Sequence, residues 1–421
     1  MRLVDYQHAI LDLADDSEEA VARRRGWITA VLRGFREDRP GDELVDRWVT
    51  HYRTDAATAR GAWLPEGELG SGPLPVATYA SLDKTLNAGR ELLPLRMITD
   101  VTTSPSHRRR GLLRQMIEAD LADAVERGVP MAALTASEAT IYGRWGFGPA
   151  TFNTTVELDT STGFALRAFA DPGRVELLEP DVAWPHVKAV FDAFHARQRG
   201  SVEWPTQYAD IHSGAFDFDA GGPNRKIRTA LHVDAGGAVD GFAVFKHGED
   251  YSLSVTEMIA LDPAAQLALW DFLAQMDRIK KVAFNLAHPD DPLQWALADV
   301  ERLKVTGGRH FLWLRVLDVP RALAARPWSA DGTVVIGVAD AQGWAAGRYE
   351  VTTRDGVATV TRTDAEADVR LDAETLATLH LGGVRVGELH RAARLAGDPG
   401  ALERLAAMAD LPDEPYCLTG F

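Results

Sequence analysis

The sequence predicts an α/β (α+β) protein with two related modules and a smaller third domain. Its 421 residues are 46% hydrophobic, which allows more than one buried core. Residues 98–150 are typical of a strand, a basic glycine turn, a helix, a second strand and a short helix. A similar order of elements recurs over residues 151–312, whereas residues 313–421 follow a different pattern that includes a hairpin signal.

The unit over residues 98–150 contains the clearest local signals in the chain. Residues 98–103 form a β-branched run of the kind found in strands. A Ser/Pro break and three arginines lead to Gly111, after which apolar residues recur at helical spacing as far as Gly128. The apolar run 131–134 predicts the next strand.

The other elements are predicted from caps, periodicity and turn residues. In the first module we expect a helix over 17–35, capped by Ser17, and strands over 76–82 and 92–99. In the second module we expect strands over 174–178, 227–233, 242–246, 251–260 and 282–286, and helices over 184–197 and 263–276. In the third we expect strands over 310–316, 334–338, 349–353 and 358–361, a hairpin turn at Arg354-Asp355-Gly356, and helices over 372–381 and 399–408.

The turn before the helix of the first module has the features of an anion site. The first amides of a helix lack intrahelical acceptors, and together with the helix dipole they favour a phosphate. Arg108, Arg109 and Arg110 add donors suited to phosphate, and Gly111 closes the turn. A solvated basic loop is the alternative reading of the same residues.

These residues carry a resemblance to a known family. The string RRRGLL resembles the coenzyme A loop of GNAT-superfamily acetyltransferases, although Leu113 stands where that pattern has a small residue. The longer string SPSHRRRGLLRQM, followed by ASEATIYGRWGFGPAT, resembles the enhanced intracellular survival (Eis) family of aminoglycoside and amine acetyltransferases. The resemblance covers nearly the whole chain and implies tandem GNAT-like domains followed by a sterol-carrier-protein-like domain.

The resemblance also implies how the chain is divided. Residues 1–150 would be the catalytic GNAT domain that binds acetyl-CoA, and residues 151–312 a degenerate GNAT-like domain. The key turn of the second module contains Asp262 but neither glycine nor arginine, so we expect no coenzyme A there. Residues 313–421 would be the sterol-carrier-protein-like domain, contributing its terminal carboxylate to the active site. Family members form hexamers, so a homo-oligomer is expected.

Composition narrows the class of partner. The net charge of −16 argues against nucleic acid and suits a cationic substrate, although acidic balance often serves only solubility. A single cysteine excludes an intrachain disulfide, and no apolar run is long enough to cross a bilayer. We therefore expect a cytoplasmic protein without membrane contact. The histidines show no metal-ligand spacing, and no P-loop is present.

The cofactor contacts are those that the resemblance places on matching positions. The strand backbone at 101–103 would pair with the pantetheine arm, and splaying of that strand from the next would open the slot. The predicted cofactor-binding residues are Val101, Thr102, Thr103, Arg108, Arg109, Arg110, Gly111, Leu112, Leu113, Arg114, Ser137 and Glu138.

Two groups are predicted to move protons. Tyr142 occupies the family's proton-donor position, and a phenol with a pKa of about 10 can protonate a departing thiolate. Packing of its short helix is the alternative role. The resemblance points to the α-carboxylate of Phe421 as the base; the apolar ending of the chain is suited to burial. We favour a role in orienting the ammonium and accepting its proton through water; an apolar tail docked on the surface is the alternative.

Asp38 and Trp48 are predicted substrate-binding residues by looser correspondence with family positions, through ion pairing and stacking respectively. An exposed loop is the alternative for both. The leading function is an acetyl-CoA-dependent N-acetyltransferase acting on aminoglycoside-like or other polycationic amines. A catalytically silent acyl-CoA or lipid-binding module, and a protein-lysine acetyltransferase, remain as alternatives.

Overall fold

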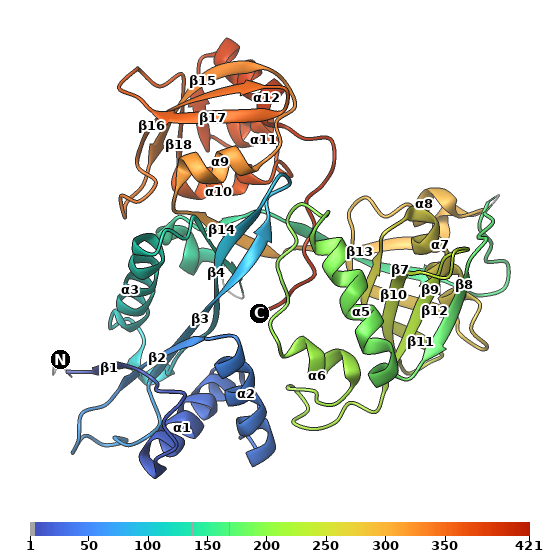
Figure 1. The fold of residues 1–421 in the computed structure, drawn as a ribbon, viewed down its shortest axis with the longest axis horizontal. Helices are drawn as coiled ribbons and strands as arrows, with labels where there is room; N and C mark the ends of the chain where they lie inside the picture. The colour runs from blue at the N-terminus through green and yellow to red at the C-terminus, as the bar shows by residue number, and fades with distance from the viewer. Residues whose placement is uncertain (1–4, 137–138, 168) are drawn as a thin grey trace.

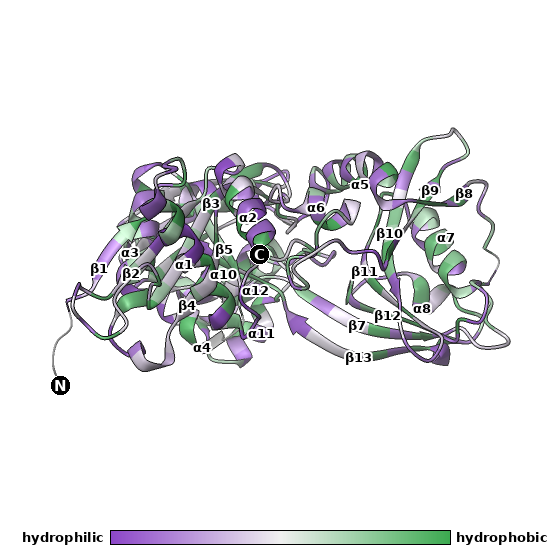
Figure 2. Ribbon diagram, turned by 90° about the horizontal axis from the view of Figure 1, so that it is seen from below, coloured by the Kyte–Doolittle hydropathy of each residue, from purple (hydrophilic) through white to green (hydrophobic). Residues whose placement is uncertain are grey.

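The computed structural model describes residues 5–136, 139–167 and 169–421. These residues form two seven-stranded sheets and one five-stranded sheet. Figure 1 shows the first sheet at the centre, with the second module on one side and the C-terminal domain against another part of the first module. In Figure 2 hydrophobic residues lie mainly on the strands and on the helix sides that face them. Within the described ranges no helix has the length and apolar character needed to cross a membrane.

The first module has the elements expected around the basic turn. Its own strands are β1 (Gln7–Ile10), β2 (Thr58–Trp63), β3 (Ala77–Asn87), β4 (Leu92–Thr103), β5 (Met131–Thr135) and β6 (Gly148–Pro149). Its helices are α1 (Glu18–Phe35), α2 (Asp42–Thr54), α3 (Leu112–Glu126) and α4 (Ala139–Tyr142), with 3-10 turns η1 (Pro105–His107) and η2 (Gly143–Trp145). Ser17 caps α1 as predicted, because its hydroxyl accepts a hydrogen bond from the Ala20 amide at 3.3 Å.

Helix α2 was not predicted. The segment is rich in acidic residues and arginines, and its sequence alone predicts neither a helix nor a strand. Its buried residues Leu44, Val45, Val49 and Tyr52 nevertheless recur at helical spacing. This helix forms one wall of the cavity described below.

The helices of the first module cover both faces of its sheet. Side chains alternate along β3, so Tyr79 packs with α3 residues while Leu82 packs with α1 and α2. The turn at 104–111 joins β4 directly to α3, so the N-terminus of α3 lies beside the end of β4.

The second module repeats this plan. Its strands are β7 (Phe152–Asp159), β8 (Arg174–Leu178), β9 (Ile227–Val233), β10 (Val239–His247), β11 (Ser252–Ala260), β12 (Lys281–Ala287) and β13 (Leu303–His310). Its helices are α5 (Pro180–His195), α6 (Tyr208–Ser213), α7 (Pro263–Ala274) and α8 (Leu293–Ala296), with the 3-10 turn η3 (Val300–Arg302). Helix α5 begins four residues earlier than predicted, with Pro180 in its first turn.

The chain crosses twice between the two large sheets. After β6 the chain leaves the first sheet, and β7 pairs antiparallel with β12 and β13 of the second sheet. After β13 the chain returns, and β14 (Leu312–Val316) is inserted between β5 and β6 of the first sheet. The prediction of a single strand over 310–316 is thus wrong. These residues form the end of β13 and all of β14, which lie in different sheets.

The C-terminal domain is a smaller α/β unit. Its sheet has the order β17 (Val357–Arg362), β16 (Gly347–Arg354), β15 (Gly332–Ala339), β18 (Val369–Asp372) and β19 (Leu395–Gly397). Its helices are α9 (Val319–Ala325), α10 (Ala373–His380), α11 (Val386–Arg391) and α12 (Pro399–Ala409). The predicted hairpin turn is confirmed, with Asp355 and Gly356 both at positive φ (49° and 76°) between β16 and β17. Helix α10 crosses β6 so closely that a Cβ on Gly148 would lie 2.2 Å from the Glu374 carbonyl oxygen.

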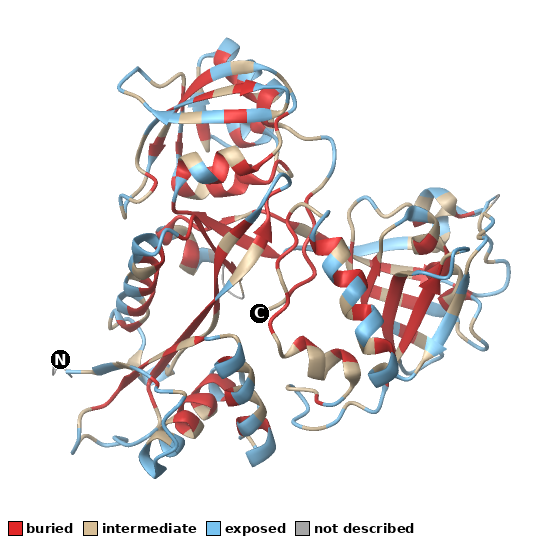
Figure 3. Cartoon of the chain, viewed as in Figure 1, coloured by how far each residue is buried: buried red, intermediate tan, exposed pale blue. Residues whose placement is uncertain are grey.

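The last residues of the chain run between the two modules. Residues 415–419 are buried, as the segment leading to the C label in Figure 3 shows. The Tyr416 amide donates to the Arg199 carbonyl at 2.9 Å, and the Thr419 hydroxyl donates to the Val202 carbonyl at 2.5 Å. The tail is therefore part of the interior rather than docked on the surface.

A buried ion pair joins the first sheet to the C-terminal domain. Arg315 on β14 contacts Asp340 after β15 at 2.6 Å, and the two side chains are 0% and 1% exposed. The Asp340 carboxylate also accepts a hydrogen bond from the Ala345 amide at 2.8 Å. Burial lowers the pKa of Arg315, with Asp340 opposing that change.

Arg315→Ala should lower the free energy of unfolding by about 3–5 kcal/mol, because it leaves the Asp340 carboxylate buried without its cation. Denaturant unfolding measures this change. Arg127→Ala, which removes an exposed pair with Asp83, is the control and should cost less than about 1 kcal/mol. Adding Asp340→Ala to Arg315→Ala should restore part of the loss; a cost for Arg315→Ala no larger than that of the control would contradict the prediction.

Candidate active site

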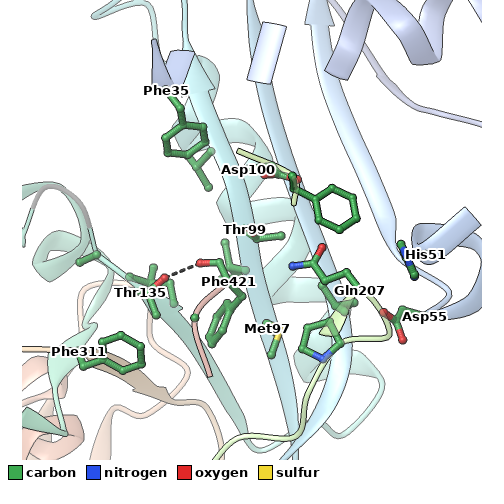
Figure 4. Close-up of a pocket in the computed structure, with 18 of the residues that line it drawn as sticks. Phe35, His51, Asp55, Met97, Thr99, Asp100, Thr135, Gln207, Phe311 and Phe421 are labelled. Atoms are coloured by element: carbon green, nitrogen blue, oxygen red, sulfur yellow. Dashed lines mark hydrogen bonds between the residues drawn. The ribbon is translucent and has the colours of Figure 1, made fainter. Parts of the chain in front are cut away.

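A cavity of about 520 Å³ opens beside the central strands of the first sheet. Its walls come from α1, α2, β4, β5, the segment 205–218 that contains α6, the end of β13 and the end of the chain. Its lining includes Phe35, Trp48, His51, Tyr52, Asp55, Met97, Thr99, Asp100, Val101, Thr135, Tyr142, Gln207, Phe218, Arg309, Phe311 and Phe421. Figure 4 shows several of these side chains around the opening. Both modules and the C-terminal segment thus contribute to one site.

The opening arises because β4 and β5 diverge. Their parallel pairing runs from Leu95–Met131 to Met97–Ala133, although β4 continues to Thr103 and β5 to Thr135. Against β3, the register of β4 shifts by one residue between Thr99 and Thr102, which is a β-bulge. The β5-facing edge of β4 beyond Met97 therefore borders a gap suited to an extended ligand, such as the predicted pantetheine arm, along Val101, Thr102 and Thr103.

The basic turn lies at the end of this strand. Arg109 and Gly111 both have left-handed backbone conformations (φ 62° and 78°), and Gly111 is the residue before α3. A Cβ on Gly111 would meet no atom within 4 Å, so space remains in front of the helix. The backbone of Leu112, Leu113 and Arg114 forms the first turn of α3, whose amides have no acceptor one turn earlier.

The side chains of the turn are available to a ligand. Arg108 and Arg109 are exposed and Arg110 is half-buried. Arg114 is exposed and contacts Glu118 at 3.5 Å on the helix surface. The conformation, open space and positive charge fit a diphosphate, so the residues here are compatible with coenzyme A. Ser137 and Glu138, also predicted cofactor-binding residues, lie outside the described residues.

Tyr142 lies at the end of α4 and lines the cavity. It is 7% exposed and packs edge-on against Phe147, with ring centroids 6.2 Å apart. Tyr142 therefore both packs against Phe147 and lines the cavity.

Phe421 lies across the β4–β5 opening from β4. Its backbone oxygen accepts a hydrogen bond from the Thr135 hydroxyl at the end of β5, as Figure 4 shows. The preceding residue is fixed by Tyr208, whose hydroxyl oxygen accepts from the Gly420 amide at 2.8 Å. The structure thus brings Tyr142 and Phe421, residues far apart in the sequence, to the same cavity.

The predicted substrate residues have different outcomes. Trp48 on α2 lines the cavity and packs edge-on against Phe218, with ring centroids 6.3 Å apart. Asp38 is exposed in the loop between α1 and α2 and is not among the lining residues. The exposed loop, the alternative given for Asp38, is the position that the structure shows, and a role for this residue in substrate binding stays a prediction.

Sequence reasoning missed Asp100 and Tyr52. Asp100 was read as one residue of a β-branched run, but it lies in the bulge of β4 with φ 53°. The Tyr52 hydroxyl donates a hydrogen bond to the Asp100 carboxylate. Burial raises the pKa of Asp100 from 3.8 to about 7, although that hydrogen bond opposes the rise. A charged residue at an inward position of a strand was the signal available in the sequence.

The corresponding cleft of the second module is occupied by the chain itself. Pairing of β11 with β12 ends at Val255–Phe284, and Tyr416 lines the cavity of about 210 Å³ beyond that point. The Tyr416 hydroxyl donates to the Leu286 carbonyl of β12. Asp262 accepts from the Ala264 amide at 2.8 Å and so caps α7 in place of an anion. These contacts support the expectation that this module binds no coenzyme A.

Cys417 has the environment of a structural thiol. It is fully buried, and burial raises its pKa to about 12, so the reactive thiolate is disfavoured. Within the described ranges no group of three or more His, Cys, Asp or Glu side chains is arranged to hold a metal ion.

Comparison with known protein families matches each part of this architecture. An acetyltransferase (GNAT) domain matches residues 22–150, and a second acetyltransferase (GNAT) domain matches residues 198–316. A sterol carrier protein domain matches residues 319–418.

Individual relatives cover most of the chain. An uncharacterized N-acetyltransferase of Streptomyces griseus is 35% identical over 378 residues, covering 86% of this chain and 88% of the relative. N-acetyltransferase Eis of Mycobacterium tuberculosis is 33% identical over 388 residues, covering 89% of this chain and 91% of the relative. The crystal structure of Eis1 from Mycobacterium abscessus superimposes with a TM-score of 0.82 at 27% identity, covering 99% of this chain and 100% of that one. The chain therefore belongs to the Eis family of GNAT-superfamily N-acetyltransferases.

Proposed function

We propose that this N-acetyltransferase moves acetyl from acetyl-CoA to amines of aminoglycoside-like or other polycationic small molecules. The observation that carries the proposal is that one cavity, open at the divergence of β4 and β5, is lined by both Tyr142 and Phe421. The basic turn at the end of β4 supplies the adjoining anion site. Together these features provide a place for an extended anionic donor and a separate space for an acceptor.

The donor would be held by the backbone of β4 and by the turn before α3. Val101, Thr102 and Thr103 would pair with the pantetheine arm, and the first-turn amides of α3 with Arg108–Arg110 would bind the diphosphate. When bound, acetyl-CoA supplies an activated acyl carbon and a thiolate leaving group. The protein's own residues must then orient the amine and manage the protons.

Tyr142 would hold the proton that the leaving group requires, at its hydroxyl. The α-carboxylate of Phe421, fixed by Thr135 and by the Gly420–Tyr208 contact, would orient the ammonium of the acceptor and receive its proton through water. The acidic character of the whole chain favours cationic acceptors.

The roles proposed for the three domains are those that the family resemblance implies. We propose residues 1–150 as the catalytic GNAT domain, 151–312 as the degenerate module that shapes the site, and 313–421 as the domain that supplies the tail. We also propose assembly of the chain into a homo-oligomer, as a hexamer, in the cytoplasm. The buried free thiol of Cys417 is compatible with that compartment.

Tyr142→Phe should lower kcat roughly 10²-fold or more, because it removes the proposed proton donor while retaining the ring. Thiol release from acetyl-CoA with a panel of aminoglycosides and polyamines measures the rate. Tyr251→Phe, at an exposed tyrosine of the second module, is the control and should leave the rate unchanged. Equal rates for Tyr142→Phe and wild type would remove Tyr142 from the mechanism.

A single glycine added after Phe421 should reduce turnover at least roughly tenfold, because it converts the proposed carboxylate to an amide and displaces the charge. Coenzyme A binding, measured by calorimetry, should be retained because the arginine turn is untouched. The same addition at the N-terminus serves as the control. Full activity of the C-terminally extended protein would rule out the carboxylate.

A further inference from the structure

Asp100 is held in an unusual backbone conformation inside the cavity. It lies in the β-bulge of β4, and its φ of 53° is one that residues other than glycine, asparagine and aspartate rarely adopt. The Thr78 hydroxyl donates to the Asp100 carbonyl at 2.8 Å, which fixes the bulge from the neighbouring strand. The bulge places the carboxylate among the residues that line the cavity.

The partner of Asp100 is a neutral phenol. Tyr52 is a buried residue of α2, and its hydroxyl donates a hydrogen bond to the Asp100 carboxylate. Burial and the neighbouring carboxylate raise the pKa of Tyr52 well above its ordinary value, so the phenol stays protonated and remains a donor. Within the described part of the chain, Tyr52 is the one hydrogen-bond donor to this carboxylate and no cation pairs with it, so its charge is uncompensated there.

The second aspartate of the described lining differs in this respect. Asp55 contacts Lys84 at 2.7 Å and accepts hydrogen bonds from the Thr206 amide and hydroxyl at 2.9 and 3.0 Å. Its charge is therefore balanced and its oxygens are occupied by protein groups. Asp100 is the better place for a cation that comes from solution.

The other titratable and charged groups of the described lining are His51, Tyr142, Arg309, His310 and the α-carboxylate of Phe421. His51 contacts Asp210 at 2.8 Å and Thr206 at 3.1 Å. The Arg309 guanidinium lies over the Phe311 ring at 5.1 Å, and burial lowers the pKa of His310, which favours its neutral form.

We propose that Asp100 binds the ammonium group of the acceptor and is the first group to accept its proton, ahead of the water-mediated route to the Phe421 carboxylate. The inference rests on the proposed function and adds a second acidic position to the acceptor site, distinct from the chain end. In this step an N–H bond of the ammonium breaks and an O–H bond of the carboxyl forms. The products are a neutral amine, which can attack an acyl carbon, and a neutral Asp100 that can pass its proton to water.

The ionisation behaviour of the site supports this role. Burial places the pKa of Asp100 at about 7, and a group with a pKa near the operating pH is the most effective proton acceptor. At lower pH the carboxyl is protonated and attracts an ammonium less. Activity with a cationic amine should therefore fall as the pH drops through 7.

The test compares Asp100→Asn, Asp100→Glu and Tyr52→Phe with wild type, using spermidine as the probe. Asp46→Asn, at an exposed carboxylate on α2 outside the lining, controls for loss of negative charge. Calorimetry at about pH 8 should show spermidine bound at least roughly tenfold more weakly by Asp100→Asn, the order expected for a charged hydrogen bond. Asp100→Glu should recover part of the loss, and Asp46→Asn should match wild type.

The pH profile of kcat/KM separates proton transfer from structural support. Wild type should lose activity below about pH 7, and Asp100→Asn should lack that limb. Tyr52→Phe removes the donor that stabilises the carboxylate, so its limb should move to higher pH while activity above the limb is retained. Equal losses at every pH in Asp100→Asn and Tyr52→Phe would indicate a purely structural pair and overturn the proposal.

Thermal stability provides a readout that does not depend on turnover. The folded-state pKa of about 7 lies above the ordinary 3.8, so the unfolded chain loses this proton first as pH rises. The free energy of unfolding of wild type therefore falls as the pH rises from the lower to the higher of these two pKa values. Asp100→Asn has no carboxyl at this position, so its free energy of unfolding lacks this fall. The Tm of Asp100→Asn should exceed that of wild type at about pH 8 and approach it at about pH 4.5.

The possible results distinguish the role of Asp100 from the proposed acetyltransferase function. If wild type releases no thiol with any amine but binds spermidine through Asp100, the proposed function fails and the ammonium site stands. If wild type is active and Asp100→Asn keeps both the wild-type affinity for spermidine and the acid limb, the role of Asp100 is refuted.

Discussion

The placement of β14 in the first sheet determines how the modules are joined and where the cavity walls lie. After β7 to β13 have formed the second sheet, β14 is hydrogen-bonded on both sides within the first sheet, so a backbone ladder joins the modules. Removing β14 would expose unpaired amides and carbonyls on β5 and β6, which is costly in buried sheets. This constraint holds the segment 205–218, which contains α6, and the end of β13 against the divergence of β4 and β5, and so builds one site from distant parts of the chain.

The same arrangement explains what the second module contributes. Both modules have a bulged strand followed by a parallel strand that diverges from it, but only the first has a glycine turn with open space in front of its helix. In the second, Asp262 caps the helix and Tyr416 enters the cleft, so the position where a ligand would lie is used to anchor the tail. The cleft of the second module thus supports the tail that ends at Phe421 in the cavity of the first module.

Local signals predicted much of the fold, and non-local contacts account for the rest. The cap at Ser17, the hairpin at Asp355-Gly356 and the turn at Gly111 depend on a few neighbouring residues, and each was readable in the sequence. The resemblance to a known family led to Tyr142 and Phe421. The return of β14 to the first sheet has no local signature, since a short, mainly apolar strand of this kind would suit either sheet. Asp100 was missed because its importance comes from burial and from Tyr52, both set by helix α2, which was not predicted.

The position of β14 also bears on synthesis at the ribosome. Translation proceeds from the N-terminus, and the strand between β5 and β6 is made only after the entire second module has been translated. Until then β5 has no partner on the side that β14 later occupies, an open edge of the kind that can pair with other chains. The first sheet is therefore completed only once residue 316 has been translated.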